Sequence, residues 1–150
     1  MLPMAEQTAS VLTDDLRRRL VEAALAARER AYSPYSGYAV GAALLTASGA
    51  VYTGCNIEIA SYGATVCAER TAAFKAVSEG ERAWRAIAIV TSNGAAPCGI
   101  CRQVLYEFGP ALTVVTANAQ GEVVWEGPLG DLLPLGFGPQ KLAEGQRAGS

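Results

Sequence analysis

Residues 86–117 read AIAIVTSNGAAPCGICRQVLYEFGPALTVVTA, and this stretch decides the fold. It begins with an uninterrupted apolar run, residues 86–91, of the kind that is buried within a sheet. Pro97 suits a first helical position, so a helix is predicted from there to Phe108, where Gly109 and Pro110 follow as breakers. A second apolar run occupies residues 112–117. The stretch therefore predicts strand, helix and strand in succession.

The sequence on either side continues this alternation. Apolar spacing predicts further elements: a helix over residues 13–31, strands over 38–46 and 51–56, a helix over 67–79 and a strand over 123–126. Thr13 is available as the N-cap of the first helix, and Gly80 ends the helix that starts near Cys67. Helices alternating with strands favour an α/β fold, with one five-stranded mixed sheet between helices on both faces, a three-layer α/β/α sandwich.

The chain length fits a single domain. A chain of 150 residues, 51% of them hydrophobic, can bury a core without disulfides. We expect one domain over residues 1–150 with its core at about 13–140. Residues 1–10 and 141–150 are polar or small, and we expect them to be mobile.

The composition excludes many functions. The chain contains no His, so catalytic triads, HExxH zinc sites and imidazole acid/base catalysis are ruled out. The 12 basic and 14 acidic residues give a net charge of -2, which argues against a nucleic-acid partner. Neither a membrane-spanning apolar run nor a basic leader is evident, so we expect no membrane association and a cytoplasmic location.

Three of the four cysteines fall at the predicted starts of two helices. Cys67 lies in CAER, and Cys98 and Cys101 lie in PCGIC. A helix N-terminus lowers thiol pKa values, and a C-x-x-C pair with one further cysteine offers Zn²⁺ three ligands, leaving the fourth tetrahedral position to water. The sequence therefore predicts an open, catalytic type of zinc site.

Two other readings of the cysteines stay open at this level. Cys98 and Cys101 could form a redox-active dithiol, although that leaves Cys67 and Glu69 unexplained. Alternatively, Cys55 could complete a closed, four-cysteine structural site, although a cysteine at the end of a strand is more often a small buried hydrophobe.

Two charged residues follow Cys67. Beside a zinc site, Glu69 would be the general acid/base of a chain without His. Three thiolates leave Zn²⁺ with a net charge of -1, so a positive group must compensate. Arg70 could donate to the thiolate sulfurs, in addition to the two helix ends.

Several fragments together resemble the homotetrameric cytidine deaminases of the zinc-dependent cytidine/deoxycytidylate deaminase family. The fragments are YSPYSGYAVGAALLT, GCNIE, CAERTA, PCGICRQVLYEFG and LLPLGFGP, in the family's order and spacing over roughly residues 30–140. The resemblance implies one Zn²⁺ per subunit on Cys67, Cys98 and Cys101, and a cytidine deaminase-like fold. It also implies that Glu69 moves protons while water replaces the amino group at C4 of cytosine.

The resemblance also assigns contacts to the substrate. Asn56 and Glu58 match residues that bind the ribose 3′-hydroxyl, and a carboxylate there favours nucleosides over nucleotides. Tyr38 matches an aromatic beside the base, where many relatives have Phe, so the partner of its hydroxyl is unassigned. The backbone of Ala68 matches a contact to the base amide, and the carbonyl near Ala96 one to the amino group.

Three further matches come from a neighbouring subunit. Phe137 matches an aromatic that reaches the base, and Ala60 and Tyr62 match positions near the 5′ end of the sugar. The resemblance thus implies a homo-oligomer, a tetramer with shared active sites. The alternative is that Phe137 and Tyr62 pack in the core of their own subunit.

The function implied is hydrolytic deamination of cytidine and deoxycytidine to uridine and deoxyuridine, with release of ammonia, in pyrimidine salvage. One alternative is a deaminase of a related aminopyrimidine nucleoside such as blasticidin S. The other, from a different class, is a non-enzymatic zinc module with four cysteine ligands.

Overall fold

A computed structural model describes residues 12–149 of the chain. In chain order its elements are α2 (Asp14–Arg28), β1 (Gly41–Thr46), β2 (Val51–Cys55), η1 (Tyr62–Ala64), α3 (Ala68–Ser78), β3 (Trp84–Val90), α4 (Gly99–Phe108), β4 (Thr113–Ala117), β5 (Val123–Pro128), η2 (Leu129–Leu132) and α5 (Pro139–Ala148), where η denotes a 3₁₀ turn.

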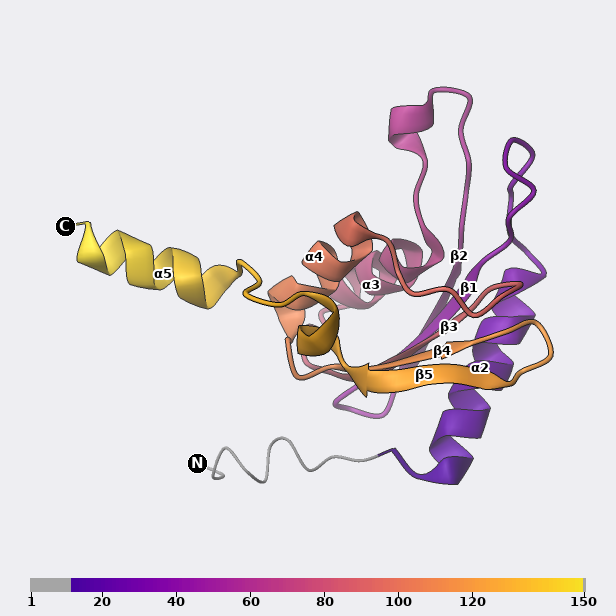
Figure 1. Cartoon of the computed structure of the whole chain (residues 1–150), viewed down its shortest axis with the longest axis horizontal. Helices are drawn as coiled ribbons and strands as arrows, with labels where there is room; N and C mark the ends of the chain where they lie inside the picture. The colour runs from indigo at the N-terminus through magenta and orange to yellow at the C-terminus, as the bar shows by residue number, and fades with distance from the viewer. Residues whose placement is uncertain (1–11, 150) are drawn as a thin grey trace.

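The strands form one five-stranded sheet in the order β2-β1-β3-β4-β5. β3 and β4 run parallel and are joined through α4, whereas the other neighbouring pairs are antiparallel. Helix α2 lies on one face of the sheet, and α3 and α4 lie on the other (Figure 1). The predicted α/β sandwich with a mixed sheet is therefore confirmed.

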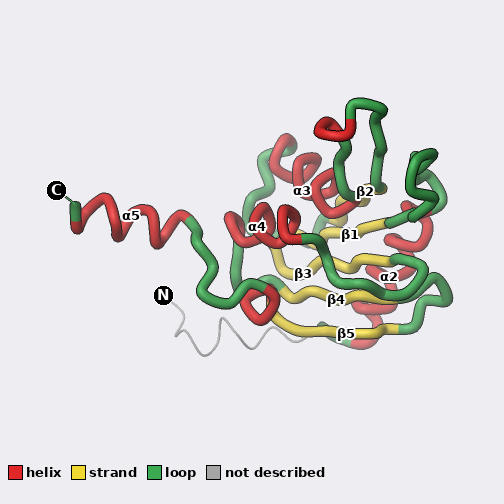
Figure 2. Tube along the Cα trace, turned by 45° about the horizontal axis from the view of Figure 1, so that its top comes forward, coloured by secondary structure: helices red, strands yellow, loops and turns green. Residues whose placement is uncertain are grey.

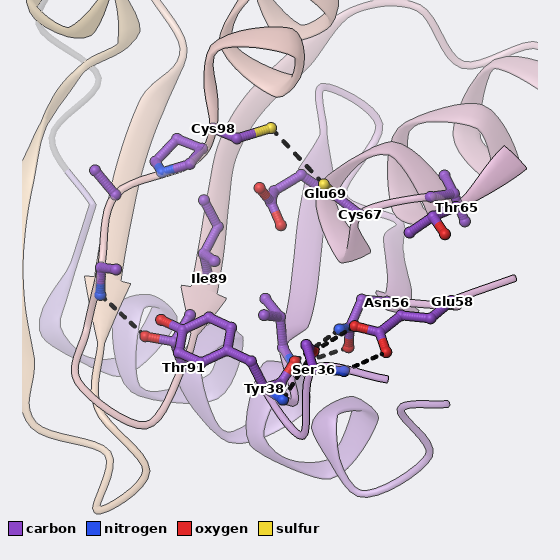
Figure 3. Close-up of a pocket in the computed structure, with 15 residues that line it drawn as sticks. Ser36, Tyr38, Asn56, Glu58, Thr65, Cys67, Glu69, Ile89, Thr91 and Cys98 are labelled. Carbon is purple, nitrogen blue, oxygen red and sulfur yellow. Dashed lines mark hydrogen bonds between the residues drawn. The ribbon is translucent and has the colours of Figure 1, made fainter. Parts of the chain in front are cut away.

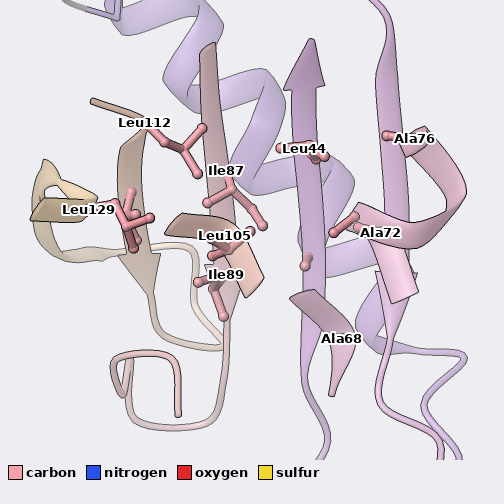
Figure 4. Close-up of a cluster of buried hydrophobic side chains, with 12 residues drawn as sticks. Leu44, Ala68, Ala72, Ala76, Ile87, Ile89, Leu105, Leu112 and Leu129 are labelled. Atoms are coloured by element: carbon pink, nitrogen blue, oxygen red, sulfur yellow. The ribbon is translucent and has the colours of Figure 1, made fainter. Parts of the chain in front are cut away.

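The alternation of side chains along β1 and β3 supplies a core to each face. Ala42 and Leu44 join Ile87 and Ile89 beneath α3 and α4, together with Leu105 (Figure 4). The intervening residues point to α2 and form a second cluster, whose members include Ala43, Leu45, Ala86, Ala88, Val90, Leu20 and Ala24. Both faces of the central strands are apolar because helices cover both (Figure 2).

Two glycines let helices approach the sheet closely. A Cβ on Gly41 would lie 2.0 Å from the backbone oxygen of Ala24 in α2, and one on Gly54 would lie 2.5 Å from the backbone nitrogen of Ala72 in α3. The Gly54 contact sets α3 against β2. Since Cys67 is the N-cap of α3, this packing also fixes the start of the helix that bears the candidate site.

Most predicted elements are confirmed, with shifted ends. Thr13 caps α2 by accepting from the Leu16 amide at 3.2 Å. Pro97 is a correction: it precedes Cys98, the N-cap of α4, and is not the first helical residue. Cys98 is thereby placed at the N-cap, where its extended backbone conformation lies outside the helix.

The termini were predicted to be mobile. Residues 1–10 lie outside the described part of the chain. At the other end, where no helix was predicted, residues 139–148 form α5, which begins with Pro139 at a first-turn position and projects from the body of the molecule (Figure 1). Within residues 12–149, no helix is both long enough and apolar enough to cross a membrane.

Candidate metal centre and pocket

Three cysteine sulfurs meet between the starts of α3 and α4. Cys67 is the N-cap of α3, Cys98 is the N-cap of α4, and Cys101 lies in the first turn of α4. Their Sγ atoms all lie within 4.8 Å of one another, and the Sγ atoms of Cys67 and Cys98 are 3.7 Å apart (Figure 3). Both helix N-termini thus direct positive potential at one point.

The spacing of these sulfurs suits zinc. A tetrahedral ion with Zn–S bonds of about 2.3 Å places its sulfur ligands about 3.8 Å apart. The Cys67–Cys98 separation matches that edge, and the burial of Cys101 contrasts with the exposure of Cys98. A metal held here would be enclosed on one side and accessible on the other, as an open catalytic site requires.

The thiols share their protons unequally. A hydrogen bond from Cys101, supported by one from Arg70, lowers the pKa of Cys67 to about 5. The same hydrogen bond to Cys67, together with burial, raises the pKa of Cys101. Without metal the Cys67 thiolate is therefore stabilised by the Cys101 thiol, and binding of a metal would displace that proton.

Arg70 supplies the positive charge that the cluster needs. Its Nη2 atom donates to Cys67 Sγ at 3.3 Å, and its Nε atom is buried without a hydrogen-bond partner among the described residues. Burial opposes the charge on Arg70, but its hydrogen bonds to Cys67 and Cys101 outweigh burial, and the pKa of Arg70 is raised. The orphaned Nε–H is a donor that fits a site rich in negative charge.

Glu69 lies in the wall of the adjoining pocket. Its exposed fraction is 4%, and its carboxyl group points into the space between the cysteines and Ile89 (Figure 3). Burial raises the pKa of Glu69, because the ionised carboxylate loses hydration. A carboxyl group with a raised pKa holds a proton more readily than an exposed carboxyl group does.

The pocket next to the cysteines has a volume of about 310 Å³. Its lining combines two of the clustered cysteines and Glu69 with residues of several loops: Ser36, Tyr38, Val40, Asn56, Glu58, Thr65, Val66, Cys67, Glu69, Ile89, Thr91, Ala95, Ala96, Pro97 and Cys98. Its volume is at the lower end of the range for small-molecule sites, which suits a ligand of nucleoside size.

Asn56 and Glu58 line this pocket and are held by backbone groups. Asn56 Oδ1 accepts from the Val40 amide at 2.9 Å, and its Nδ2 donates to the Tyr38 carbonyl at 2.8 Å. Glu58 accepts from the amides of Tyr35 and Ser36 at 2.9 and 3.0 Å, and from the Ser36 hydroxyl. The Ser36 hydrogen bonds lower the pKa of Glu58, so the pocket keeps a carboxylate at neutral pH.

Tyr38 spans the mouth of the pocket. Its ring lies beside Thr91 (Figure 3), and its hydroxyl donates to Asn93 Oδ1 at 2.7 Å. This contact supplies the partner of the hydroxyl that the sequence left unassigned. Of the two backbone positions predicted to touch substrate, Ala96 lines the pocket, and Ala68 is the fully buried first residue of α3.

The residues predicted to act on a neighbouring subunit lie elsewhere on this chain. Ala60 and Tyr62 belong to the loop that projects between β2 and α3, and Tyr62 is 73% exposed with its ring edge-on to Tyr35. Phe137 is 59% exposed, and its carbonyl accepts from Gln103 Nε2 at 2.7 Å. The alternative that Phe137 and Tyr62 fill the core of their own subunit is therefore wrong.

Cys55 does not join the cluster. It lies at the end of β2, where its Sγ is 3.5 Å from the Arg30 carbonyl, and it lines a separate cavity between α2, β2 and α3. Among the residues described here, the sulfurs that converge are those of Cys67, Cys98 and Cys101. This placement disfavours the closed four-cysteine site.

Sequence reasoning missed several residues of the pocket. Ser36 and Thr91 organise its loops, and Thr65 accepts from the Ile59 amide at 3.0 Å. Each is a small hydroxyl residue in a turn or at a strand end, which is an ordinary place for such residues. The role of Ser36 could have been predicted from its place in the YSPYSGY stretch, two positions before Tyr38.

Comparison with known families gives a match over most of the described domain. Residues 14–117 match the model of a family described as "Cytidine and deoxycytidylate deaminase zinc-binding region". The matched range includes all three clustered cysteines and Glu69, and it ends before α5.

Individual relatives are similar over nearly their full lengths. A cytidine deaminase of Halalkalibacterium halodurans is 53% identical over 124 residues, covering 81% of this chain and 93% of the relative. One of Sporosarcina psychrophila is 46% identical over 128 residues, covering 83% and 93%. The crystal structure of cytidine deaminase from Burkholderia pseudomallei superposes with a TM-score of 0.77 at 52% identity, covering 84% of this chain and all of that one.

Proposed function

Because the chain belongs to the cytidine and deoxycytidylate deaminase family, we propose that it hydrolyses cytidine and deoxycytidine to uridine and deoxyuridine with release of ammonia. The observation that carries this proposal is that Glu69, Cys67 and Cys98 all line one pocket of about 310 Å³. A proton carrier and candidate metal ligands would therefore face the same molecule when one binds in this pocket.

Cys67, Cys98 and Cys101 would hold the metal, one Zn²⁺ per subunit. When bound, Zn²⁺ supplies Lewis acidity that makes water nucleophilic near neutral pH. The chain's own contribution is to offset the charge of three thiolates. Arg70 and the N-termini of α3 and α4 perform that task, because their positive ends converge on the sulfurs.

Glu69 would move the protons of the reaction. Its carboxylate accepts a proton from the attacking water and delivers one to N3 of the cytosine ring. It would then take the proton of the hydroxyl added at C4 and give it to the amino group, which leaves as ammonia while the C4 carbonyl forms. Burial raises the pKa of Glu69, which makes its carboxylate a better proton acceptor than an exposed carboxylate would be.

Loop residues would orient the nucleoside. Asn56 and Glu58 offer hydrogen-bonding capacity to a sugar hydroxyl beyond the backbone bonds they already make. The low pKa of Glu58 keeps a negative charge there, which would repel a phosphate. The ring of Tyr38 would pack beside the base, and the backbone near Ala68 and Ala96 would bind its polar edge.

The full site would form in an assembly of identical chains, which we take to be a tetramer. Ala60, Tyr62 and Phe137 lie outside the pocket lining of their own chain and are exposed or carried on projecting segments. Their place is therefore consistent with contacts to a neighbour's substrate. A cytoplasmic location and a role in pyrimidine salvage remain predictions from the sequence.

Substitution Glu69→Gln tests this assignment. We expect the zinc content to stay near that of the parent, because Glu69 is not one of the three cysteine ligands. The rate of cytidine deamination should fall about 10²- to 10⁴-fold, because an amide side chain cannot act as a general acid or base. Cys55→Ser is the matched control outside the cluster, and it should keep both zinc and activity. Full activity of the Glu69→Gln protein would exclude this role for Glu69.

A substrate panel tests the specificity. Absorbance changes are followed with cytidine, deoxycytidine, cytosine, CMP, adenosine and blasticidin S. We expect turnover of the two cytosine nucleosides and little with CMP that carries its phosphate on the 3′ oxygen, because Glu58 would repel a phosphate there. Turnover of blasticidin S alone would favour the antibiotic deaminase, and no turnover of any compound would leave a non-enzymatic zinc module.

A further inference from the structure

Two loops face each other across the pocket mouth. The first, residues 35–40, precedes β1 and carries Tyr38. The second, residues 91–98, follows β3 and ends at Cys98, the N-cap of α4. Each contributes to the pocket wall, so the width of the mouth depends on how the loops are held together.

A chain of hydrogen bonds crosses this gap through Tyr38. On one side, the Tyr38 amide donates to Ser36 Oγ at 3.0 Å, and the Ser36 hydroxyl donates to Glu58. On the other side, the Tyr38 hydroxyl donates to Asn93 Oδ1 at 2.7 Å. The Tyr38 side chain is thus fixed at its backbone and at its tip.

The hydrogen bonds on the Asn93 side lead toward the cysteine cluster. Asn93 Oδ1 also accepts from Thr91 Oγ1 at 3.2 Å, and Thr91 Oγ1 accepts from the Ala95 amide at 2.9 Å. Ala95 and Ala96 line the pocket and lie just before Cys98. Asn93 therefore receives two hydroxyl donors and connects Tyr38 to the segment ahead of the cysteine.

We propose that Tyr38 and Asn93 are a positioning pair that fixes the aromatic wall of the pocket and ties it to the loop preceding Cys98. The proposal rests on the proposed deaminase function and adds to it a specific role for the Tyr38 hydroxyl. A phenylalanine would provide the same ring for a base but would leave both the ring tip and Asn93 without this bond.

The pair should affect substrate binding more than chemistry. Neither side chain reaches the cysteine cluster by a direct hydrogen bond among those described, and the ring stands at the pocket mouth, away from Glu69 (Figure 3). Loss of one hydrogen bond of ordinary net strength changes an equilibrium by about two- to tenfold. We therefore expect the change in KM and in the dissociation constant of uridine, with kcat largely kept.

The test removes each half of the pair. Tyr38→Phe and Asn93→Ala should each raise the KM for cytidine, and the uridine Kd measured by calorimetry, by about three- to tenfold. The double variant should be no worse than Asn93→Ala alone, because Asn93→Ala already deletes the bond to Tyr38. Asn93→Asp retains an acceptor oxygen and should restore values within about twofold of the parent.

Hydrogen exchange supplies a readout that does not depend on turnover. The amide of Ala95 should exchange faster in Tyr38→Phe than in the parent, since its acceptor Thr91 loses a neighbouring restraint. Tyr32→Phe, which removes a hydroxyl from an exposed tyrosine outside the pocket lining, is the matched control.

Two results would overturn the pairing: a KM and Kd for Tyr38→Phe within twofold of the parent, or effects of the single variants that multiply in the double variant. A parent protein that does not deaminate cytidine would refute the proposed function instead. Exchange at Ala95 would then still decide whether the pair restrains the loop.

Discussion

Arg70 donates to Cys67 Sγ at 3.3 Å while its Nε atom is buried without a partner among the residues described. A buried donor without an acceptor is costly, so its retention needs a compensating interaction. The thiolate of Cys67 provides one, because its negative charge attracts the guanidinium. Arg70 is therefore held in place by the negative charge that it neutralises.

Substitution Arg70→Ala should weaken metal binding. Residues that support metal ligands from behind typically contribute about 10- to 100-fold in affinity, and we expect a loss of that size for zinc, measured by competition with a chromogenic chelator. Arg70→Lys keeps the positive charge but not the planar guanidinium, so its zinc affinity should lie between those of the parent and of Arg70→Ala. The exposed Arg82→Ala controls for the loss of one positive charge. Equal zinc affinity in Arg70→Ala and Arg82→Ala would contradict the supporting role.

At the scale of single residues, the sequence predicted chemistry better than contacts. Cys67, Cys98 and Cys101 could be grouped from their spacing and helix starts alone, because a helix end constrains where its cap residue points. The internal hydrogen bonds of Asn56 and Glu58, and the bond from Tyr38 to Asn93, could not be predicted. The last joins residues 55 positions apart, and no local pattern encodes such a pair.

Helices α3 and α4 convert sequence spacing into the geometry of the site. Each begins at a cysteine cap beside the same pocket, and each packs its apolar side on Ala42, Leu44, Ile87 or Ile89 of the sheet. The N-terminal ends are therefore positioned by core packing rather than by the site itself. Metal removal should accordingly leave the sheet and its helices assembled.

The α-helices that the sequence predicts and the one that it misses differ in burial. Helices α2, α3 and α4 show apolar spacing because each buries one side against the sheet. Helix α5 has only partly buried and exposed residues, so its sequence lacks that stripe, although Pro139 marks its start. The predicted helix start at Pro97 was wrong for a different reason: proline fits the extended conformation before an N-cap as well as the first helical position.

Glu81 links two elements and gives stability a dependence on pH. It follows α3 and accepts from Thr46 Oγ1 at 2.9 Å and from the Ser48 hydroxyl, which joins it to the β1–β2 hairpin. These hydrogen bonds, that from Ser48 first, lower the pKa of Glu81 below its ordinary value of about 4.5. A lowered folded-state pKa stabilises the fold above the ordinary value, and the benefit is lost as pH falls through the folded-state pKa.

Glu81→Gln should therefore reduce the free energy of unfolding at pH 7, and the deficit should shrink as the pH falls below about 4.5. Urea unfolding of variant and parent at each pH measures the deficit, and because the comparison is made at equal pH, loss of zinc in acid affects both proteins. Glu29→Gln, at an exposed carboxylate after α2, is the control. A deficit that does not change with pH would count against an ionic contribution of Glu81.

At the scale of the whole molecule, the described chain presents apolar side chains on its projecting parts. Leu135 and Phe137 are more than half exposed on the arm that leads into α5, Leu142 is half exposed within α5, and Tyr62 is exposed on the β2–α3 loop. Figure 1 shows that α5 and this loop project from the body of the molecule. Arg102 and Gln103 of α4 secure the start of this arm by donating to the carbonyls of Leu132 and Phe137 at 2.8 and 2.7 Å. A helix that carries metal ligands at its start thus also anchors the arm.

Mixing two defective proteins distinguishes a shared site from a self-contained one. If Phe137 serves a neighbouring pocket, Phe137→Ala weakens substrate binding in the neighbour, whereas Glu69→Gln disables only its own pocket. Subunits of the two variants, exchanged and reassembled, would then create some pockets with an intact Glu69 from one chain and an intact Phe137 from the other. We expect cytidine turnover at low substrate concentration to exceed the sum of the separate proteins.

Assembly of each variant alone is the control for this mixing, since neither preparation can form a complete pocket. Sedimentation must show the same oligomer for both variants, because Phe137 on an exposed arm could otherwise act by holding subunits together. If Phe137 acted within its own chain, every mixed pocket would lack either Glu69 or Phe137. Mixing would then give only the average of the two rates, and the shared site would be excluded.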